Sequence, residues 1–103
     1  LLLLNARARL IGEVNISRGT VDAGVISPRE LFIEALQRGA VSIVLLHNHP
    51  SGDPTPSKED VRITRRIQGA GSMIGIELLD HIIIGNNCFI SLSEKGFLRR
   101  KQE

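Results

Sequence analysis

Apolar residues along this chain gather in short runs that alternate with polar and glycine-containing breaks. A run of about four to eight apolar residues bounded by turn residues is typical of a β-strand. The strands predicted in this way cover residues 1–4, 9–17, 42–46, 77–84 and 88–92, with turns at 5–7 and 85–87. The run at 42–46 is nearly unbroken, which predicts a central strand covered on both faces.

A first helix is predicted to begin at Ser27. Ser27 and Glu30 match a capping box, and Pro28 occupies the first helical position, where its missing N–H costs nothing. Gly39 can end this helix in the left-handed conformation. Its apolar residues share one face: Leu31, Phe32, Ala35 and Leu36.

A second helix is predicted to begin at Ser57, an N-cap hydroxyl three residues before a carboxylate. Ile63, Ile67 and Ala70 continue an apolar stripe along it, and Asp60 lies on the same stripe. A carboxylate on an inward face is unfavourable without a partner of opposite charge, so Asp60 is expected to have one, and a bound cation would be such a partner. The helix is expected to end in the glycine-rich stretch Gly69, Gly71 and Gly75.

Strands on either side of two helices predict an α/β domain, a mixed β-sheet flanked by helices. With 103 residues, the chain has room for one hydrophobic core, so residues 1–103 are expected to form a single domain. The apolar opening at residues 1–4 is far too short for a signal peptide or a membrane span, which indicates no membrane partner.

Composition narrows the classes of function. Aromatic residues make up only 3% and the net charge is only +2, so base stacking and strong binding to phosphate backbones are both poorly supported. Cys88 is the single cysteine, so the chain cannot form an internal disulfide, and the cytoplasm is the expected compartment. Cys88 is predicted to be a small buried apolar residue rather than a nucleophile.

The candidate chemistry lies between the third strand and the second helix. His47 and His49 are two apart on an extended segment, so their side chains point to the same face and can bind one ion together. Three prolines and a glycine shape the following loop at residues 50–56, and Asp60 follows eleven residues after His49. Two imidazoles and one carboxylate are the donor set of catalytic zinc, which keeps a fourth position open for water.

The same residues resemble a known family. His47-Asn48-His49-Pro50, seven residues to Ser57, and then Asp60 look like the JAMM signature His-x-His-x7-Ser-x2-Asp. The longer stretch His-Asn-His-Pro-Ser-Gly-Asp-Pro-x-Pro-Ser-x-x-Asp at 47–60, with Leu-Asp-His-Ile-Ile at 79–83, is similar to bacterial RadC proteins.

This resemblance implies an MPN/JAMM-like (cytidine-deaminase-like) fold over nearly the whole chain. It implies zinc ligands at His47, His49 and Asp60, and support of an oxyanion by the Ser57 hydroxyl. Members with the complete signature are metallopeptidases, some of which cut isopeptide bonds. RadC proteins carry a DNA-repair name, but the motif itself supports hydrolysis of a peptide or another amide.

The JAMM mechanism also needs a glutamate as general base. In RadC-like proteins this glutamate is expected a few residues before the first strand, hence upstream of Leu1, and the domain is therefore expected to be truncated at its N-terminus. Glu13, on the second predicted strand, is the fallback candidate.

Alternative interpretations remain open. His81 could be a fourth ligand, but a structural role or an indirect one beside the ligands is favoured, because a fourth protein ligand would close the water position. A second hypothesis is a DNA-associated module with a structural metal. It would place Arg62, Arg65, Arg66 and the Arg99-Arg100-Lys101 tail on phosphates.

Overall fold

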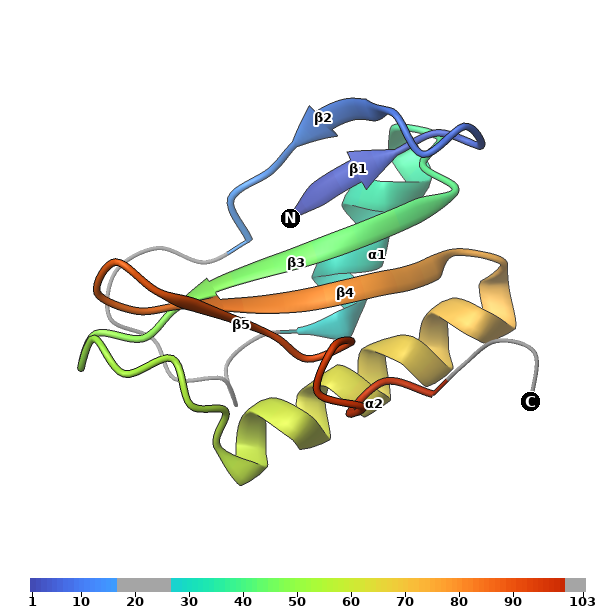
Figure 1. Ribbon diagram of the computed structural model, residues 1–103. Helices are drawn as coiled ribbons and strands as arrows, with labels where there is room; N and C mark the ends of the chain where they lie inside the picture. The colour runs from blue at the N-terminus through green and yellow to red at the C-terminus, as the bar shows by residue number, and fades with distance from the viewer. Residues whose placement is uncertain (17–26, 100–103) are drawn as a thin grey trace.

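The computed structural model describes residues 1–16 and 27–99, and within these ranges it contains five strands and two helices (Figure 1). The elements are β1 (Leu2–Leu4), β2 (Leu10–Glu13), α1 (Pro28–Gln37), β3 (Ser42–Asn48), α2 (Lys58–Ile74), β4 (Glu77–Ile84) and β5 (Phe89–Ser91). The strands form one sheet in the order β2-β1-β3-β4-β5. The mixed α/β fold predicted from the sequence is confirmed.

β3 and β4 form the centre of the sheet and run parallel, while every other pairing is antiparallel. The connection between these two strands is helix α2. In parallel strands the carboxyl ends lie at the same edge of the sheet, so the last residues of β3 emerge beside those of β4. The loop that follows β3 then leads directly into the first turn of α2.

The core lies between one face of the sheet and both helices. Its buried side chains form one cluster that includes Leu3, Ile43 and Leu45 from the sheet, Leu31 and Phe32 from α1, and Ile63 and Ile67 from α2. α1 and α2 also contact each other, since a Cβ added at Gly71 would lie only 3.2 Å from the ring of Phe32. Both helices therefore pack on the same side of the sheet.

The opposite face is more open than the sequence suggested. Val44 is only partly buried and Leu46 is 39% exposed, so the prediction that β3 is covered on both faces is wrong for the residues described. The alternation of a strand places Ile43 and Leu45 on one face and Val44 and Leu46 on the other. Because both helices pack on the first face, neither covers the second.

Several predicted boundaries and environments also differ. β2 ends at Glu13, and α2 continues through Gly69 and Gly71 to Ile74, with Gly75 as its left-handed C-cap. Leu36 is 58% exposed because it turns away from the sheet at the end of α1, although it was expected on the buried face. Cys88 is exposed in the turn before β5, so its predicted burial is wrong.

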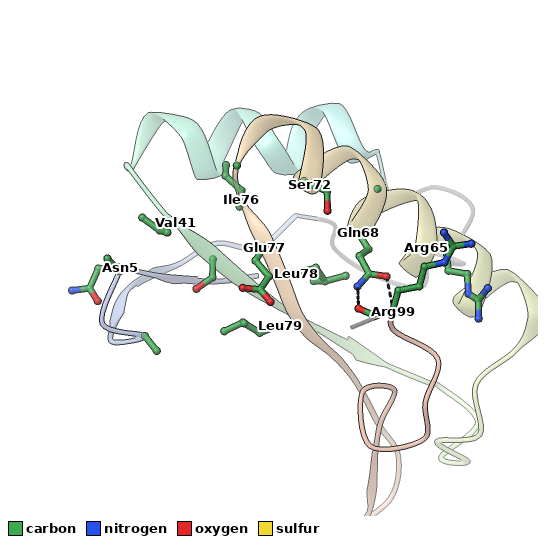
Figure 2. A pocket seen from close by; sticks show the side chains of 16 residues that line it. Asn5, Val41, Arg65, Gln68, Ser72, Ile76, Glu77, Leu78, Leu79 and Arg99 are labelled. Atoms are coloured by element: carbon green, nitrogen blue, oxygen red, sulfur yellow. Dashed lines mark hydrogen bonds between the residues drawn. The ribbon is translucent and has the colours of Figure 1, made fainter. Parts of the chain in front are cut away.

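A groove of about 800 Å³ lies near the amino-terminal ends of β3 and β4, beside the outer surface of α2 (Figure 2). It is at the opposite end of β3 from the histidines. Neither helix among the described residues is long and apolar enough to cross a membrane.

Candidate metal centre

β3 delivers the first histidine. Ile43, Leu45 and His47 alternate along the strand and face the helices, and the first two are buried in the core. His47 comes after the last of these apolar positions, where the core gives way to the loop. Its side chain is only 14% exposed.

The loop after β3 holds the second histidine in a fixed orientation. Nδ1 of His49 lies 2.9 Å from the backbone oxygen of Asp53, which can only accept a hydrogen bond, so this nitrogen carries the proton. The loop is anchored in turn, because Asn86 N–H donates to the oxygen of Gly52 at 2.8 Å. A Cβ at Gly85 would come within 2.3 Å of the same oxygen, so glycine is required at this close approach.

The start of α2 holds the carboxylate. Ser57 is the N-cap: its hydroxyl oxygen accepts a hydrogen bond from Asp60 N–H at 3.0 Å, and Ser57 N–H donates back to Asp60 Oδ2 at 2.8 Å. This reciprocal pair is the capping box expected at a helix start. It leaves the Asp60 side chain 1% exposed and aimed at the end of β3.

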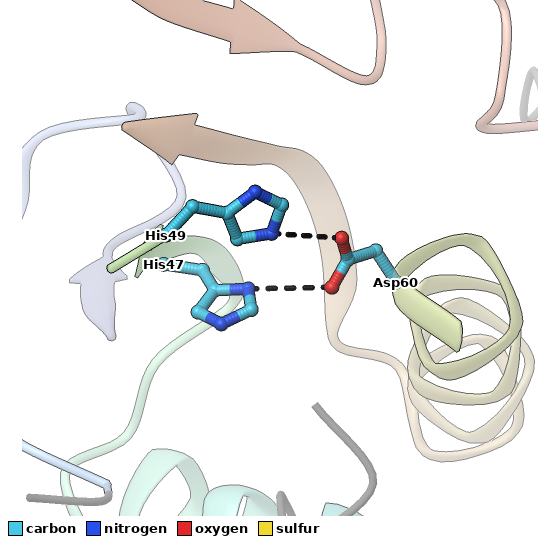
Figure 3. A group of neighbouring side chains, drawn as sticks. All are labelled: His47, His49 and Asp60. Carbon is cyan, nitrogen blue, oxygen red and sulfur yellow. Dashed lines mark hydrogen bonds and ion pairs between the residues drawn. The ribbon is translucent and has the colours of Figure 1, made fainter. Parts of the chain in front are cut away.

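The three predicted ligands converge. Figure 3 shows both imidazoles directed at the carboxylate, with His49 Nε2 2.9 Å from Asp60 Oδ2 and His47 Nδ1 3.5 Å from Asp60 Oδ1. One ligand atom from each residue lies within 4.8 Å of the other two. The sequence predicts that these residues share one site, and in the structure they lie together.

The hydrogen bonds of this cluster suit a cation. With a proton on Nδ1, His49 can face Asp60 through Nε2 only if the ring is doubly protonated or a cation lies between the two groups. His47 Nδ1 is buried and has no hydrogen-bond partner among the described residues. A buried nitrogen without a partner costs about 1–3 kcal/mol, and coordination of an ion would remove that cost.

The electrostatics of the site favour the coordinating protonation states. Burial lowers the pKa of His47, as does the neighbouring His49, while Asp60 opposes the shift. Burial raises the pKa of Asp60, but hydrogen bonds with Ser57 and the Coulombic effect of His47 and His49 outweigh it and hold this pKa below its ordinary value. A neutral imidazole and an ionised carboxylate are the forms that bind a metal.

Behind the ligands lies a buried support that sequence reasoning only partly anticipated. His81 is fully buried on β4 and stacks on His47, with ring centroids 5.8 Å apart. Its Nδ1 lies 2.6 Å from the Thr64 hydroxyl, which also lies 2.6 Å from the backbone oxygen of Asp60. His81 is outside the ligand cluster.

Thr64 was missed, although the sequence carried a signal for it. Thr64 is polar and lies on the apolar stripe between Ile63 and Ile67, four residues after Asp60 and therefore on the same helix face. A buried hydroxyl on such a stripe needs partners, and here they are Asp60 and His81. The backbone oxygen of Asp53 carried no comparable signal, since loop carbonyls cannot be oriented from sequence.

Of the two other residues predicted for catalysis, Ser57 lies beside the three predicted ligands and Glu13 lies away from them. Ser57 is exposed beside Asp60, and the proton of its hydroxyl remains available because its oxygen is the acceptor in the cap. Glu13 is exposed at the end of β2, which β1 separates from β3. The catalytic roles of Ser57 and Glu13 remain predictions.

The arginines of the DNA hypothesis are not equivalent. Arg62 forms an ion pair with Glu59 at 2.7 Å, whereas Arg65 and Arg66 form none among the described residues. Arg99 lines the groove beside α2 together with Arg65. Arg100 and Lys101 lie outside the described residues.

An α/β domain with a His-x-His pair at a strand end and an aspartate at the following helix start has the architecture expected of JAB-type domains. The profile of the RadC-like JAB domain matches residues 1–97. The chain belongs to this RadC family.

Its similarity to bacterial relatives is high along nearly all of the chain. It is 52% identical over 96 residues to the UPF0758 protein ABC2615 of Shouchella clausii, covering 93% of this chain and 42% of the relative. It is 54% identical over 97 residues to a UPF0758 protein of Desulforamulus reducens, covering 94% of this chain and 43% of the relative. The chain thus spans less than half the length of these relatives.

Proposed function

We propose that this domain is a zinc-dependent hydrolase of peptide, isopeptide or related amide bonds, with His47, His49 and Asp60 as the three protein ligands. The observation that carries the proposal is the convergence of these side chains, with one ligand atom of each within 4.8 Å of the others. The donor set of two nitrogens and one oxygen is that of catalytic zinc sites, in which a fourth position stays open.

Residues of this chain can support the oxyanion and hold the ligand atoms in position. When bound, zinc supplies Lewis-acid chemistry, acidifying water and polarising a substrate carbonyl. The exposed Ser57 hydroxyl, whose oxygen already caps α2, can donate its proton to the oxygen that becomes negative in the substrate. His47, whose pKa burial lowers, and the His49 ring, held by the Asp53 carbonyl, keep two ligand atoms in place.

A glutamate must still carry a proton from the attacking water to the leaving amine. The RadC resemblance puts this general base before the first strand, and Glu13, exposed at the end of β2, is the alternative.

The test combines metal analysis with hydrolysis. Purified chain treated with zinc should hold one ion, measured by mass spectrometry of the metal, and the UPF0758 protein ABC2615 should cleave a quenched fluorescent peptide or isopeptide library. In this chain, Asp60→Asn should lose the zinc, although the asparagine can still accept the Ser57 hydrogen bond that caps the helix. Zinc retained at full occupancy in Asp60→Asn, or a library left uncut by the zinc-loaded relative, would contradict the proposal.

A further inference from the structure

The first half of β4 is an open edge of the sheet. β3 pairs with the whole length of β4 on one side, but on the other side β5 pairs only with Ile82–Ile84. Glu77–Leu79 therefore have no strand partner on their outer side among the described residues. An unpaired edge presents backbone donors and acceptors that can pair with another extended chain.

The groove borders this edge. It crosses the amino-terminal ends of β3 and β4, and Figure 2 shows Glu77, Leu78 and Leu79 in its middle, Asn5 and Val41 at one end, and Arg65, Gln68 and Arg99 on the α2 side, next to the free edge. Its volume of about 800 Å³ is large enough for several residues of an extended peptide.

The wall formed by α2 already binds a peptide backbone. The Gln68 side-chain amide donates to the backbone oxygen of Arg99 at 2.7 Å, and its oxygen accepts from Arg99 N–H at 3.0 Å. This pairing fixes Arg99 beside Arg65 across 31 residues of sequence. Neither arginine forms an ion pair within residues 1–16 and 27–99, so two guanidinium groups remain available at the same wall.

Gly69 is the least expected part of this wall. Glycine inside a helix costs about 0.5–1 kcal/mol relative to alanine, so a packing reason is expected for it. Gly71 has such a reason, because its Cβ would lie 2.2 Å from the backbone oxygen of Ile76. A Cβ at Gly69 would meet nothing within 4 Å, so folding does not require glycine here. What glycine does provide is a low wall beside the groove.

From these features we infer that the groove binds an extended acidic peptide, which adds as a strand to the free edge of β4 and directs carboxylates at Arg65 and Arg99. Strand addition uses main-chain hydrogen bonds for affinity and alternate side chains for specificity. A nucleic acid fits less well, because it cannot supply strand pairing and no aromatic side chain lines the groove for stacking. Glu77, at the same edge, disfavours an acidic side chain at its end of the bound segment.

The probe is a fluorescein-labelled peptide of alternating glutamate and valine, which presents its carboxylates on one face when extended. Fluorescence anisotropy should show saturable binding below about 1 mM, and a matched lysine–valine peptide should bind at least about tenfold more weakly. Nitrogen-15 NMR spectra should place the perturbed amides at residues 68–72 and 77–79.

Two variants test the groove, and a third is their control. Gly69→Leu should fill the space and weaken binding at least about tenfold, while improving helix propensity. The double variant Arg65→Ala and Arg99→Ala should also weaken binding about tenfold by removing both charges. Arg66→Ala, an exposed arginine of α2 that does not line the groove, should change affinity by less than about twofold.

Peptide binding in the groove does not depend on the proposed metal site or on its hydrolase activity. Binding should persist in excess EDTA and in Asp60→Asn, so failure of the metal site leaves this result unchanged. Equal binding of the lysine peptide, perturbed amides centred on residues 47–60, or tighter binding of a single-stranded DNA oligonucleotide in the same groove would each overturn it. So would a concentration-dependent dimer in sedimentation experiments that the Gly69→Leu change abolishes.

Discussion

At the scale of single residues, the burial of His81 has the clearest electrostatic consequence. It is fully buried on β4, and burial together with the nearby His47 lowers its pKa to about 4. A neutral ring without charge can stack on His47 without repelling a cation at the ligands. Its Nε2 has no hydrogen-bond partner among the described residues, so protonation there would place a charge in the core that only the nearby carboxylates of Asp60 and Asp80 partly offset.

This depressed pKa predicts a loss of stability in mild acid. The unfolded chain takes up a proton on His81 near pH 6.5, whereas the folded chain resists until about pH 4. Lowering the pH through this window therefore favours the unfolded state, by up to about 3 kcal/mol, and the full stability is present above pH 6.5. Urea unfolding of EDTA-treated protein at several pH values measures the effect.

The His81→Gln variant separates this contribution from that of His47, whose pKa burial also lowers. Asp60 titrates below this pH window, because the pKa of that carboxyl lies under its ordinary value. The variant should be less stable overall, but its stability should fall less steeply between pH 6.5 and 4. An identical slope in both proteins would show that His81 titrates normally in the fold.

At the scale of elements, α2 contributes to the core and positions Asp60 of the candidate site. Two of its glycines, Gly69 and Gly71, have different surroundings. Gly71 is buried, and a Cβ there would approach the oxygen of Ile76 to 2.2 Å. Gly69 faces open space. The two positions lie in the same helix and gain the same helix propensity from alanine, so any difference between them reports packing.

Gly71→Ala should destabilise the protein by more than about 2 kcal/mol, because backbone atoms at the end of α2 would have to move. Gly69→Ala should stabilise it by about 0.5–1 kcal/mol through helix propensity alone. Thermal and urea unfolding of both variants at neutral pH provide the comparison. Equal effects of the two substitutions would mean that α2 does not pack against Ile76 as described.

Some features of the fold and of the candidate site could be predicted from the sequence, and others could not. The start of α2 and the inward direction of His47 follow from local rules, namely a helix cap and the alternation of a strand, and the structure agrees. His49 lies just beyond β3, and its orientation depends on the loop carbonyl of Asp53. The open face of β3 and the exposure of Leu36 could not be predicted, since they depend on where the helices pack. An apolar run looks the same whether one or both of its faces are covered.

At the scale of the whole molecule, the candidate site connects two parts of the fold, the carboxyl end of β3 and the first turn of α2. Two ligands come from the end of β3 and one from the first turn of α2, with an irregular loop between them. An ion bound by all three would cross-link the strand to the helix in the folded state. The unfolded chain offers no such preformed site.

Zinc should therefore stabilise the fold as a linked equilibrium. At a free concentration of about one hundred times the dissociation constant, the gain should be about 2.7 kcal/mol, which raises the melting temperature by about 10–20 °C for a domain of this size. Differential scanning calorimetry of the chain with EDTA and with buffered zinc measures the shift.

Asp60→Asn should abolish the increase, because a neutral amide replaces the only anionic ligand while the helix cap is kept. Glu59→Gln is the matched control: Glu59 is the preceding residue of α2, is exposed, and pairs with Arg62 instead of the histidines. This variant should retain the whole increase. A shift that survives in Asp60→Asn would place the bound zinc somewhere other than between β3 and α2.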